Sequence, residues 1–164
     1  LAATALHKVR VINANGDLSR FESYGLPVIP DSLPDWPGPL AGILSCLDWL
    51  AQSHCESDLL LSWATDAPFI SSDLAFRLLQ ARTAENATLA QARSSGRRHP
   101  VFGLWPVSIR QDLRTALIED GLRKIDDFTD RFSLAIADFA GHPDPFSNVN
   151  QPDDIAAAEA YFDS

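Results

Sequence analysis

The chain has 164 residues, a length typical of one domain, and 46% of them are apolar, which excludes a disordered chain. Thirteen basic residues stand against 22 acidic ones, and the net charge of −9 argues against a nucleic-acid-binding protein while allowing a small anionic ligand. No apolar run approaches the ~20 residues that span a bilayer, and the two cysteines make no disulfide framework. We therefore expect a protein of a reducing compartment, the cytoplasm, with no membrane partner.

The first half of the chain alternates predicted strands with predicted helices, whose bounds follow from turn residues, N-cap residues and apolar periodicity. The predicted strands and extended pieces are Val9–Asn13, Pro27–Pro30 and Leu59–Ala64, and the predicted helices are Asp17–Tyr24, Leu40–Gln52 and Leu74–Glu85. Asp17 is the expected N-cap of the first helix and Gly25 its expected stop. Leu59–Ala64 is apolar throughout, which is typical of a central strand buried on both faces.

The second half mixes a hairpin with helices. Its predicted strands are Thr88–Ala92, Val101–Trp105 and Leu134–Phe139, with a polar turn at Ser94–His99 between the first two. Its predicted helices are Ser108–Glu119, Arg123–Arg131 and Asp153–Phe162, the last after a loop at His142–Pro152. Because strands alternating with helices are typical of βαβ units, we predict a three-layer α/β/α fold with one mixed, mainly parallel sheet.

Polar residues that follow predicted strands are the first candidates for a binding site, because ligands of α/β sheets bind beyond the carboxyl ends of parallel strands. The amide of Asn13 suits a nucleobase or ribose edge, although an Asx turn is the simpler alternative. Asp31 could accept hydrogen bonds from guanine or ribose, or serve only as a turn residue. Asp66, between an apolar strand and Ala67-Pro68, could hold Mg²⁺ together with substrate phosphates, or cap a helix.

Three further segments carry candidate residues. Gly38 opens a helix whose N-terminus favours anions, although one Gly-Pro turn is a weak indication. Arg97-Arg98-His99-Pro100 is a cationic segment in an acidic chain, so it either binds an anionic group or forms a solvated hairpin turn. Asn148 and Asn150 alternate in an extended segment, so their amides face one way and could contact a pterin, or support a loop.

Taken together, these segments resemble the molybdenum cofactor guanylyltransferases, and they occur in the order of that family. The resemblance runs from about residue 9 to the C-terminus. It is carried by Val11–Asn15, Asp31, Asp35–Ile43, Thr65–Ile70 with Asp73-Leu74, Arg98–Phe102 and Phe146–Asn150. It implies a Rossmann-like fold of the nucleotide-diphospho-sugar transferase type.

The resemblance implies transfer of GMP from Mg²⁺-GTP to the terminal phosphate of molybdopterin-bound molybdenum cofactor, giving the guanine dinucleotide cofactor and pyrophosphate. The residues that it assigns to GTP are Asn13, Asp31, Gly38 and Asp66, with Asp66 also catalytic and the Mg²⁺ ligand. The residues that it assigns to molybdopterin are Asn148, Asn150 and His99. It divides the domain into a nucleotide-binding half, 1–85, and a molybdopterin-binding half, 86–164. Molybdoenzyme chaperones or other proteins of cofactor biosynthesis are the further partners that it allows.

The chain departs from the family chiefly at its front. The family begins with a strand, a glycine-rich phosphate-binding loop and a helix, and these 164 residues, which begin at Leu1 and contain no methionine, do not include that segment. We expect Leu1–Leu6 to be the tail of the missing helix. We also expect these 164 residues by themselves to bind nucleotide very weakly, because the phosphate-binding loop is absent. Two smaller departures are Gln151-Pro152 in place of Thr-Pro, and Ala64-Thr65 in place of the usual Pro-Cys before Asp66.

Three alternative functions stay open. The first is a cytidylyltransferase that acts on the same cofactor, although Gly38–Gly42 favours guanine. The second is a truncated, non-catalytic module that holds molybdopterin or a partner protein. The third is a sugar-nucleotide pyrophosphorylase, which the Asn148-Val149-Asn150 ending disfavours.

Overall fold

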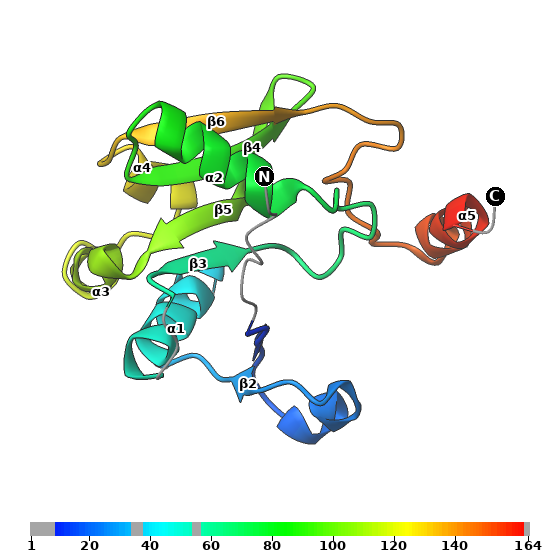
Figure 1. Cartoon of the computed structure of the whole chain (residues 1–164). Coiled ribbons are helices and arrows are strands. Elements are labelled where there is room, and N and C mark those ends of the chain that lie inside the picture. Colours follow the sequence, from blue (N-terminus) through cyan, green and yellow to red (C-terminus); the bar gives the residue numbers. More distant parts are fainter. Residues whose placement is uncertain (1–8, 34–37, 54–56, 163–164) are drawn as a thin grey trace. The chain divides into compact units, whose positions relative to one another are not determined.

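The computed structural model describes residues 9–33, 38–53 and 57–162 (Figure 1). The chain divides into two compact units that interleave along the sequence, one formed by residues 1–60 and 106–128 and the other by residues 61–105 and 129–164. The predicted functional halves, 1–85 and 86–164, stay a prediction. The expectations for Leu1–Leu6 and for Asp35–Pro37 concern residues outside those described.

The first unit pairs a short parallel ribbon with helices. Its elements are β1 (Ile12–Asn13), the 3₁₀ helix η1 (Leu18–Tyr24), β2 (Val28–Ile29), α1 (Pro39–Gln52), η2 (Val107–Ile109), α3 (Arg110–Ile118) and most of α4 (Ile125–Thr129). The strand predicted from Val9 is shorter than expected, and the helix predicted to start at Ser108 begins as η2. The predicted cap of η1 is confirmed, because the Asp17 carboxylate accepts from the Ser19 N–H at 3.0 Å.

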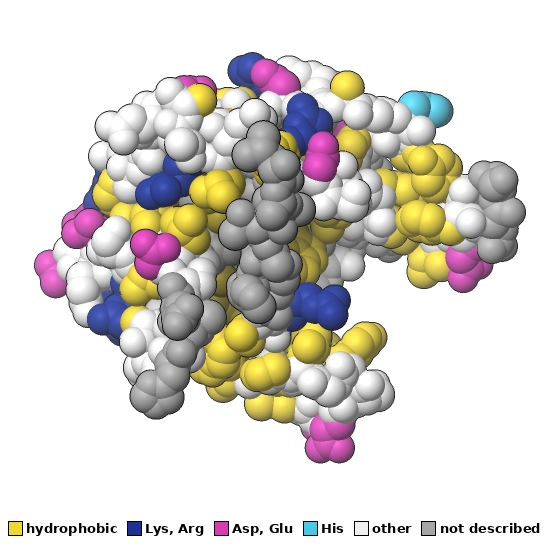
Figure 2. All heavy atoms as spheres, viewed as in Figure 1, with side chains coloured by type: hydrophobic (Ala, Val, Ile, Leu, Met, Phe, Trp, Pro, Cys, Tyr) yellow, Lys and Arg dark blue, Asp and Glu magenta, His cyan; other side chains and the backbone are white. Residues whose placement is uncertain are grey.

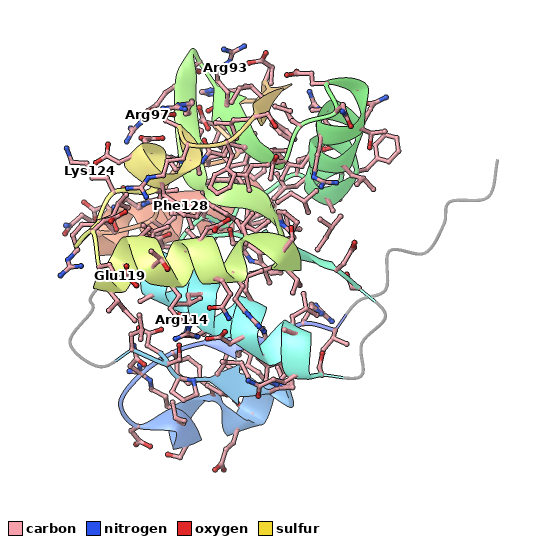
Figure 3. All side chains as sticks on the ribbon, turned by 90° about the vertical axis from the view of Figure 1, so that its left-hand side faces the viewer. Arg93, Arg97, Arg114, Glu119, Lys124 and Phe128 are labelled. Carbon is pink, nitrogen blue, oxygen red and sulfur yellow. The ribbon has the colours of Figure 1, made fainter. Side chains whose placement is uncertain are left out.

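Helix α1 carries the core of the first unit. Nearly all of its residues from Leu40 to Leu50 are buried, and it packs against α3. The polar link between the two helices is Asp48, which forms ion pairs with Arg110 at 3.5 Å and with Arg114 at 2.5 Å. Figure 3 shows Arg114 extending from α3 towards α1. Since these side chains are half-buried, the pairs add a polar contact to the apolar packing of the two helices.

The second unit is built on a mixed sheet. Its elements are α2 (Leu74–Ala84), β4 (Leu89–Ser94), β5 (Arg97–Pro106), β6 (Leu134–Phe139) and α5 (Pro152–Phe162), with the end of β3 (Leu59–Ser62). The strand order is β3-β5-β4-β6, with β4 antiparallel to β5 and parallel to β6. Helix α2 packs against β4 and β6 (Figure 1). The predicted α/β class with a mixed sheet is confirmed, while β1 and β2 pair separately from these four strands.

Two predictions about the strands are wrong. The turn expected over Ser94–His99 is confined to Ser95 and Gly96, and β5 already begins at Arg97. The reason is that both turn residues have positive φ, which closes a two-residue hairpin and leaves the following polar residues in the ladder. Among the described strands, β3 lies at the edge of its sheet and not at its centre, and its four residues are only half-buried. An apolar run therefore reports neither the number of neighbouring strands nor how fully its faces are covered.

Helix α5 is held by aromatic contacts. The Phe69 ring lies 5.2 Å from the Tyr161 ring and 5.6 Å from the Phe162 ring, measured between centroids. Hydrophobic side chains gather on and beside α5 in Figure 2. Across residues 9–33, 38–53 and 57–162, no helix has the length and apolar character needed to cross a bilayer.

Candidate functional site

Asn13, Asn15 and Asp31 form a hydrogen-bonded network where β1 and β2 end. Asn13 Nδ2 donates to Asp31 Oδ1 and to the Ile29 carbonyl, both at 2.9 Å. Asn15 Nδ2 donates to Asp31 Oδ2 at 2.8 Å, while its Oδ1 accepts from the Asp31 N–H at 2.9 Å. Amides thus orient both carboxylate oxygens, which keep further lone pairs for a ligand N–H or O–H. The structure therefore brings together Asn13 and Asp31, the two residues predicted to contact guanosine.

Two glycines shape the start of α1 beside this network. A Cβ atom on Gly42 would lie 2.1 Å from Asn13 Oδ1, so the helix can approach Asn13 only because position 42 has no side chain. Gly38 precedes α1 with φ 129°, a conformation that residues with side chains rarely adopt. The structure thus explains both glycines by geometry, and the GTP contact of Gly38 stays a prediction.

The turn that carries Asp31 is anchored to α1. Ser45 Oγ accepts from the Ser32 N–H at 2.8 Å and donates to the Ala41 carbonyl at 2.8 Å. Ser32 Oγ reaches Asp48 Oδ2 at 3.3 Å. Burial raises the pKa of the neighbouring Cys46 thiol to about 11, with a further contribution from the charge of Asp31, so the thiol stays protonated at neutral pH. This layer holds Asp31 in place and carries no reactive group.

A cavity of about 660 Å³ lies in the second unit, beside the β4–β5 turn and the segment before α5. Three residues predicted for the molybdopterin side line it, namely His99, Asn148 and Asn150. They come from β5 and from the segment that precedes α5, about fifty residues apart in the chain. A volume of several hundred Å³ is that of a small-molecule site. The structure therefore gathers these three residues around one space.

Arginines supply the positive charge at this cavity. Arg97 and Arg98 both line it. Arg98 forms an ion pair with Asp130 at 3.2 Å, whereas Arg97 makes no ion pair within residues 9–33, 38–53 and 57–162. Arg97 is exposed and extends from the β4–β5 hairpin (Figure 3). It is the arginine available to an anionic group that enters the cavity.

A buried serine links two titratable side chains at the same wall. Ser94 Oγ lies 2.7 Å from His99 Nε2, and 2.9 and 2.7 Å from Asp144 Oδ1 and Oδ2. Burial lowers the pKa of His99, the nearby charge of Arg97 lowers it further, and Asp144 opposes both. Burial raises the pKa of Asp144, but hydrogen bonds from Ser94 and from the Phe146 N–H outweigh it, so that pKa lies below its ordinary value. His99 is therefore mostly neutral, and Asp144 charged, at neutral pH.

Asp66 lies in the loop between β3 and α2 and is half-buried. Its carbonyl accepts from the Val149 N–H at 2.8 Å, so the chain between Asn148 and Asn150 is bound to it directly. The Asp66 carboxylate is not part of the cavity lining. The structure thus fixes Asp66 to the segment that carries the paired asparagines, and its metal role stays a prediction.

The sequence analysis does not single out three residues that the structure places in the network around Asp31 and in the wall of the cavity. They are Asn15, Ser94 and Asp144. The sequence indicates Asn15 only as part of the turn after β1. A signal for it exists, since Asn13 and Asn15 alternate as Asn148 and Asn150 do. Ser94 and Asp144 are fifty residues apart, and no local pattern connects them.

Comparison with known proteins identifies the family. Residues 1–132 match the family of MobA-like NTP transferase domains. The chain belongs to this family. It is 50% identical over 149 residues to the molybdenum cofactor guanylyltransferase of Rhodopseudomonas palustris, covering 90% of this chain and 71% of that protein. It is 40% identical to the enzyme of the same name from Mesorhizobium japonicum, covering 92% and 74%. By its family, the chain is a nucleotidyltransferase.

The fold agrees with a solved relative. The crystal structure of molybdopterin-guanine dinucleotide biosynthesis protein A from Archaeoglobus fulgidus superimposes with a TM-score of 0.71. The match covers 93% of this chain and 78% of that one at 21% sequence identity. At this identity, the likeness shows that the two proteins share a fold.

Proposed function

We propose that this protein transfers GMP from Mg²⁺-GTP to the terminal phosphate of molybdopterin-bound molybdenum cofactor, giving the guanine dinucleotide cofactor and pyrophosphate. The observation that carries the proposal is the cavity where His99, Asn148 and Asn150 meet beside Arg97. Such a lining offers amide donors and acceptors for a pterin and a cation for its phosphate. The names of the relatives point to the same reaction.

The network around Asp31 supports guanine as the base. Guanine presents an N1–H and an amino group along one edge, and an ionised carboxylate accepts from both. Asn13 and Asn15 hold the two oxygens of Asp31 in fixed positions, so little ordering remains to be done when the base binds. Asp31 is therefore the residue that we assign to guanine selection.

Mg²⁺ fits the residues that are present. Within the described ranges, no three His, Cys, Asp or Glu side chains lie together as a ready metal site. A single carboxylate suits Mg²⁺, which uses one or two carboxylates and keeps waters and substrate phosphates as its other ligands. Asp66 is the side chain that would hold the ion. When bound, Mg²⁺ neutralises charge on the triphosphate.

In this reaction the main task of the protein is to position two anions, GTP and the phosphate of molybdopterin. A terminal phosphate oxygen of molybdopterin attacks the α-phosphorus of GTP, and the bond from that phosphorus to the oxygen of the β-phosphate breaks. Pyrophosphate leaves with the electron pair of the broken bond. The incoming phosphate is already ionised, so no general base is required. Asp31 orients the base, Arg97 binds the incoming phosphate, and Asn148 with Asn150 binds the pterin.

The test is a turnover assay on protein expressed from the complete gene. Molybdenum cofactor and Mg²⁺ are supplied with GTP or with CTP, and the dinucleotide is separated by chromatography while pyrophosphate is counted. We expect product with GTP. Product with CTP alone would overturn the base assignment, and cofactor binding without turnover of either nucleotide would overturn the catalytic proposal.

Asp66 is tested in the same assay. Asp66→Asn is expected to lose at least about a hundredfold in turnover, because a carboxylate that holds the metal contributes several kcal/mol of charge stabilisation. Asp112→Asn, an exposed change on α3 outside the motifs of the family, is the matched control and should stay near wild type. Equal activity of the two variants would refute the metal role.

A cytoplasmic location and chaperone partners stay predictions.

A further inference from the structure

The hydroxyl of Ser94 determines how the wall of the cavity presents His99. Ser94 is the last residue of β4 and only 2% exposed. It has polar neighbours on two sides, His99 Nε2 at 2.7 Å and both carboxylate oxygens of Asp144 within 2.9 Å. A hydroxyl has a single proton to donate, so it cannot donate to both partners.

The protonation state of Asp144 resolves that choice. An ionised carboxylate only accepts, so the Ser94 hydroxyl must donate its proton to Asp144. The Ser94 oxygen is then an acceptor towards His99, and Nε2 must carry the hydrogen. The reverse tautomer would place two lone pairs against each other at 2.7 Å. Neutral His99 is therefore the Nε2–H tautomer, and its unprotonated nitrogen is Nδ1.

Two aromatic rings hold the plane of the imidazole. The His99 ring centroid lies 4.7 Å from that of Phe146 and 6.2 Å from that of Phe102. The charged groups that act on His99 are Asp144 and Arg97. With the ring plane and one nitrogen fixed, Nδ1 is the ring atom through which His99 can exchange a hydrogen bond with a molecule in the cavity.

We propose that Ser94 and Asp144 are positioning residues that lock His99 as the Nε2–H tautomer, so that Nδ1 accepts a hydrogen bond from a ring or amino N–H of the pterin. The proposal rests on the proposed function and deepens it. It divides the cavity by chemistry, because a neutral acceptor suits the N–H donors of a pterin, whereas the exposed Arg97 suits its phosphate. Neither Ser94 nor Asp144 contacts the substrate in this scheme.

The first test is nitrogen NMR of the His99 ring in the full-length protein, free and with unsubstituted pterin as the probe. In wild type we expect Nε2 protonated and Nδ1 unprotonated, with Nδ1 shifting when pterin is added. In Ser94→Ala the two tautomers should mix. A wild-type ring protonated on Nδ1 would overturn the proposal, whether or not the enzyme turns over.

The second test separates pterin binding from phosphate binding. Ser94→Ala should weaken pterin binding about three- to tenfold, the loss expected for one neutral hydrogen bond, and leave binding of inorganic phosphate unchanged. Arg97→Gln should weaken binding of inorganic phosphate and leave pterin binding unchanged. In turnover, Ser94→Ala should raise KM for the molybdenum cofactor while kcat and KM for GTP stay as in wild type. Thermal melting checks that each variant is folded.

Ser133→Ala is the matched control, since it removes an exposed serine hydroxyl of the same unit that pairs with Thr88 far along the sheet from His99. It should match wild type in every measurement. If Ser94→Ala binds pterin as wild type does, the positioning role is refuted while the transferase function stands. If wild type neither binds pterin nor makes dinucleotide, both the proposed function and the role of Nδ1 are refuted.

Discussion

Asn13 occupies space that a glycine leaves open in the facing helix. Gly42 is buried in α1, and its Cα faces Asn13 Oδ1 so closely that a methyl group would lie 2.1 Å away. The Asn13 amide in turn donates to Asp31 Oδ1 at 2.9 Å. The absence of a side chain at position 42 therefore allows Asn13 to donate its hydrogen bond to Asp31, the carboxylate that we assign to guanine.

Gly42→Ala should separate stability from nucleotide binding. The new methyl displaces the Asn13 side chain, which then loses its hydrogen bonds to the Ile29 carbonyl and to Asp31, and it leaves the helix intact. Alanine favours a helix interior over glycine by about 1 kcal/mol, which offsets much of the loss of the two Asn13 hydrogen bonds, so Tm should stay within a few degrees of wild type. KM for GTP should rise about tenfold, the cost of one lost hydrogen bond to a charged group. Thermal melting and turnover kinetics measure the two effects.

A double-mutant cycle decides whether the effect runs through Asn13. Asn13→Ala should raise KM for GTP by itself, and Gly42→Ala should add nothing in that background, because the displaced side chain is already gone. If the two changes are additive, Gly42 acts on the nucleotide by another route and this explanation is wrong.

The lowered pKa of His99 makes the free energy of unfolding depend on pH. Because burial holds the folded pKa below 6.5, the unfolded chain takes up a proton first as pH falls. The unfolded state then binds more protons, so stability declines as pH drops through 6.5. Asp144, whose pKa is held below 3.8, adds a loss only in the acid range, as the pH approaches 3.8 and falls further.

We expect the urea midpoint of wild type to fall between about pH 7.5 and about pH 5.5, and that of His99→Gln to fall less, because glutamine does not titrate. His142→Gln, an exposed change in the loop after β6, is the control and should follow wild type. A steeper pH dependence in His99→Gln than in wild type would mean that the folded pKa of His99 lies above the unfolded one.

At the scale of elements, the local sequence predicts most helices and strands within a few residues, and it fails where polarity is taken as a sign of a turn. Arg97, Arg98 and His99 are polar, yet they lie in β5, because polarity reports the exposure of a side chain and not its backbone conformation. Ser95 and Gly96, at φ 49° and 77°, make the hairpin turn. Alternation along β5 then places His99 where Ser94 can reach it.

One carboxylate makes the ion pairs between α1 and α3 that accompany their apolar packing. Asp48 pairs with Arg110 and Arg114 and also accepts from Ser32 beside Asp31. Asp48→Ala should lower the free energy of unfolding by about 2 kcal/mol, because it leaves two half-buried arginines without their partner. Urea unfolding measures the loss.

Gln111→Ala, an exposed change on α3, is the matched control and should stay within about 0.5 kcal/mol of wild type. KM for GTP should also rise in Asp48→Ala, since the turn that carries Asp31 and Ser32 loses an anchor. Wild-type stability in Asp48→Ala would show that the ion pairs do not hold the helices together.

At the scale of the whole molecule, the candidate residues fall into two groups that sequence order does not reveal. Asn13 and Asp31 lie in the first unit, and Asp66 with the cavity residues lies in the second. The parallel pairing of β1 with β2 makes the first group predictable, since the ends of parallel strands meet. The link from Ser94 to Asp144 is not predictable, because it spans fifty residues and needs the sheet and the loop to be folded first.

The acidity of these 164 residues leads to the last prediction. With a net charge of −9, these 164 residues repel GTP and molybdopterin at long range, so metal and local cations must offset the charge of the substrates. Since Mg²⁺ takes one or two carboxylates and uses substrate phosphates and waters as its other ligands, an ion held by Asp66 should bind with the nucleotide and not to the free protein. Mg²⁺ alone should therefore shift Tm by less than about 1 °C.

Mg²⁺ with GTP should raise the Tm of the protein from the complete gene by several degrees, because a ligand at about 100 times its Kd stabilises the folded state by about 2.7 kcal/mol. Asp66→Asn should lose most of that shift, while the Asp112→Asn control keeps it. An equal rise with Mg²⁺ alone would mean that the chain holds a preformed metal site. The carboxylate of Asp66 would then have partners beyond the substrate, and its assigned role in joining metal and triphosphate would be wrong.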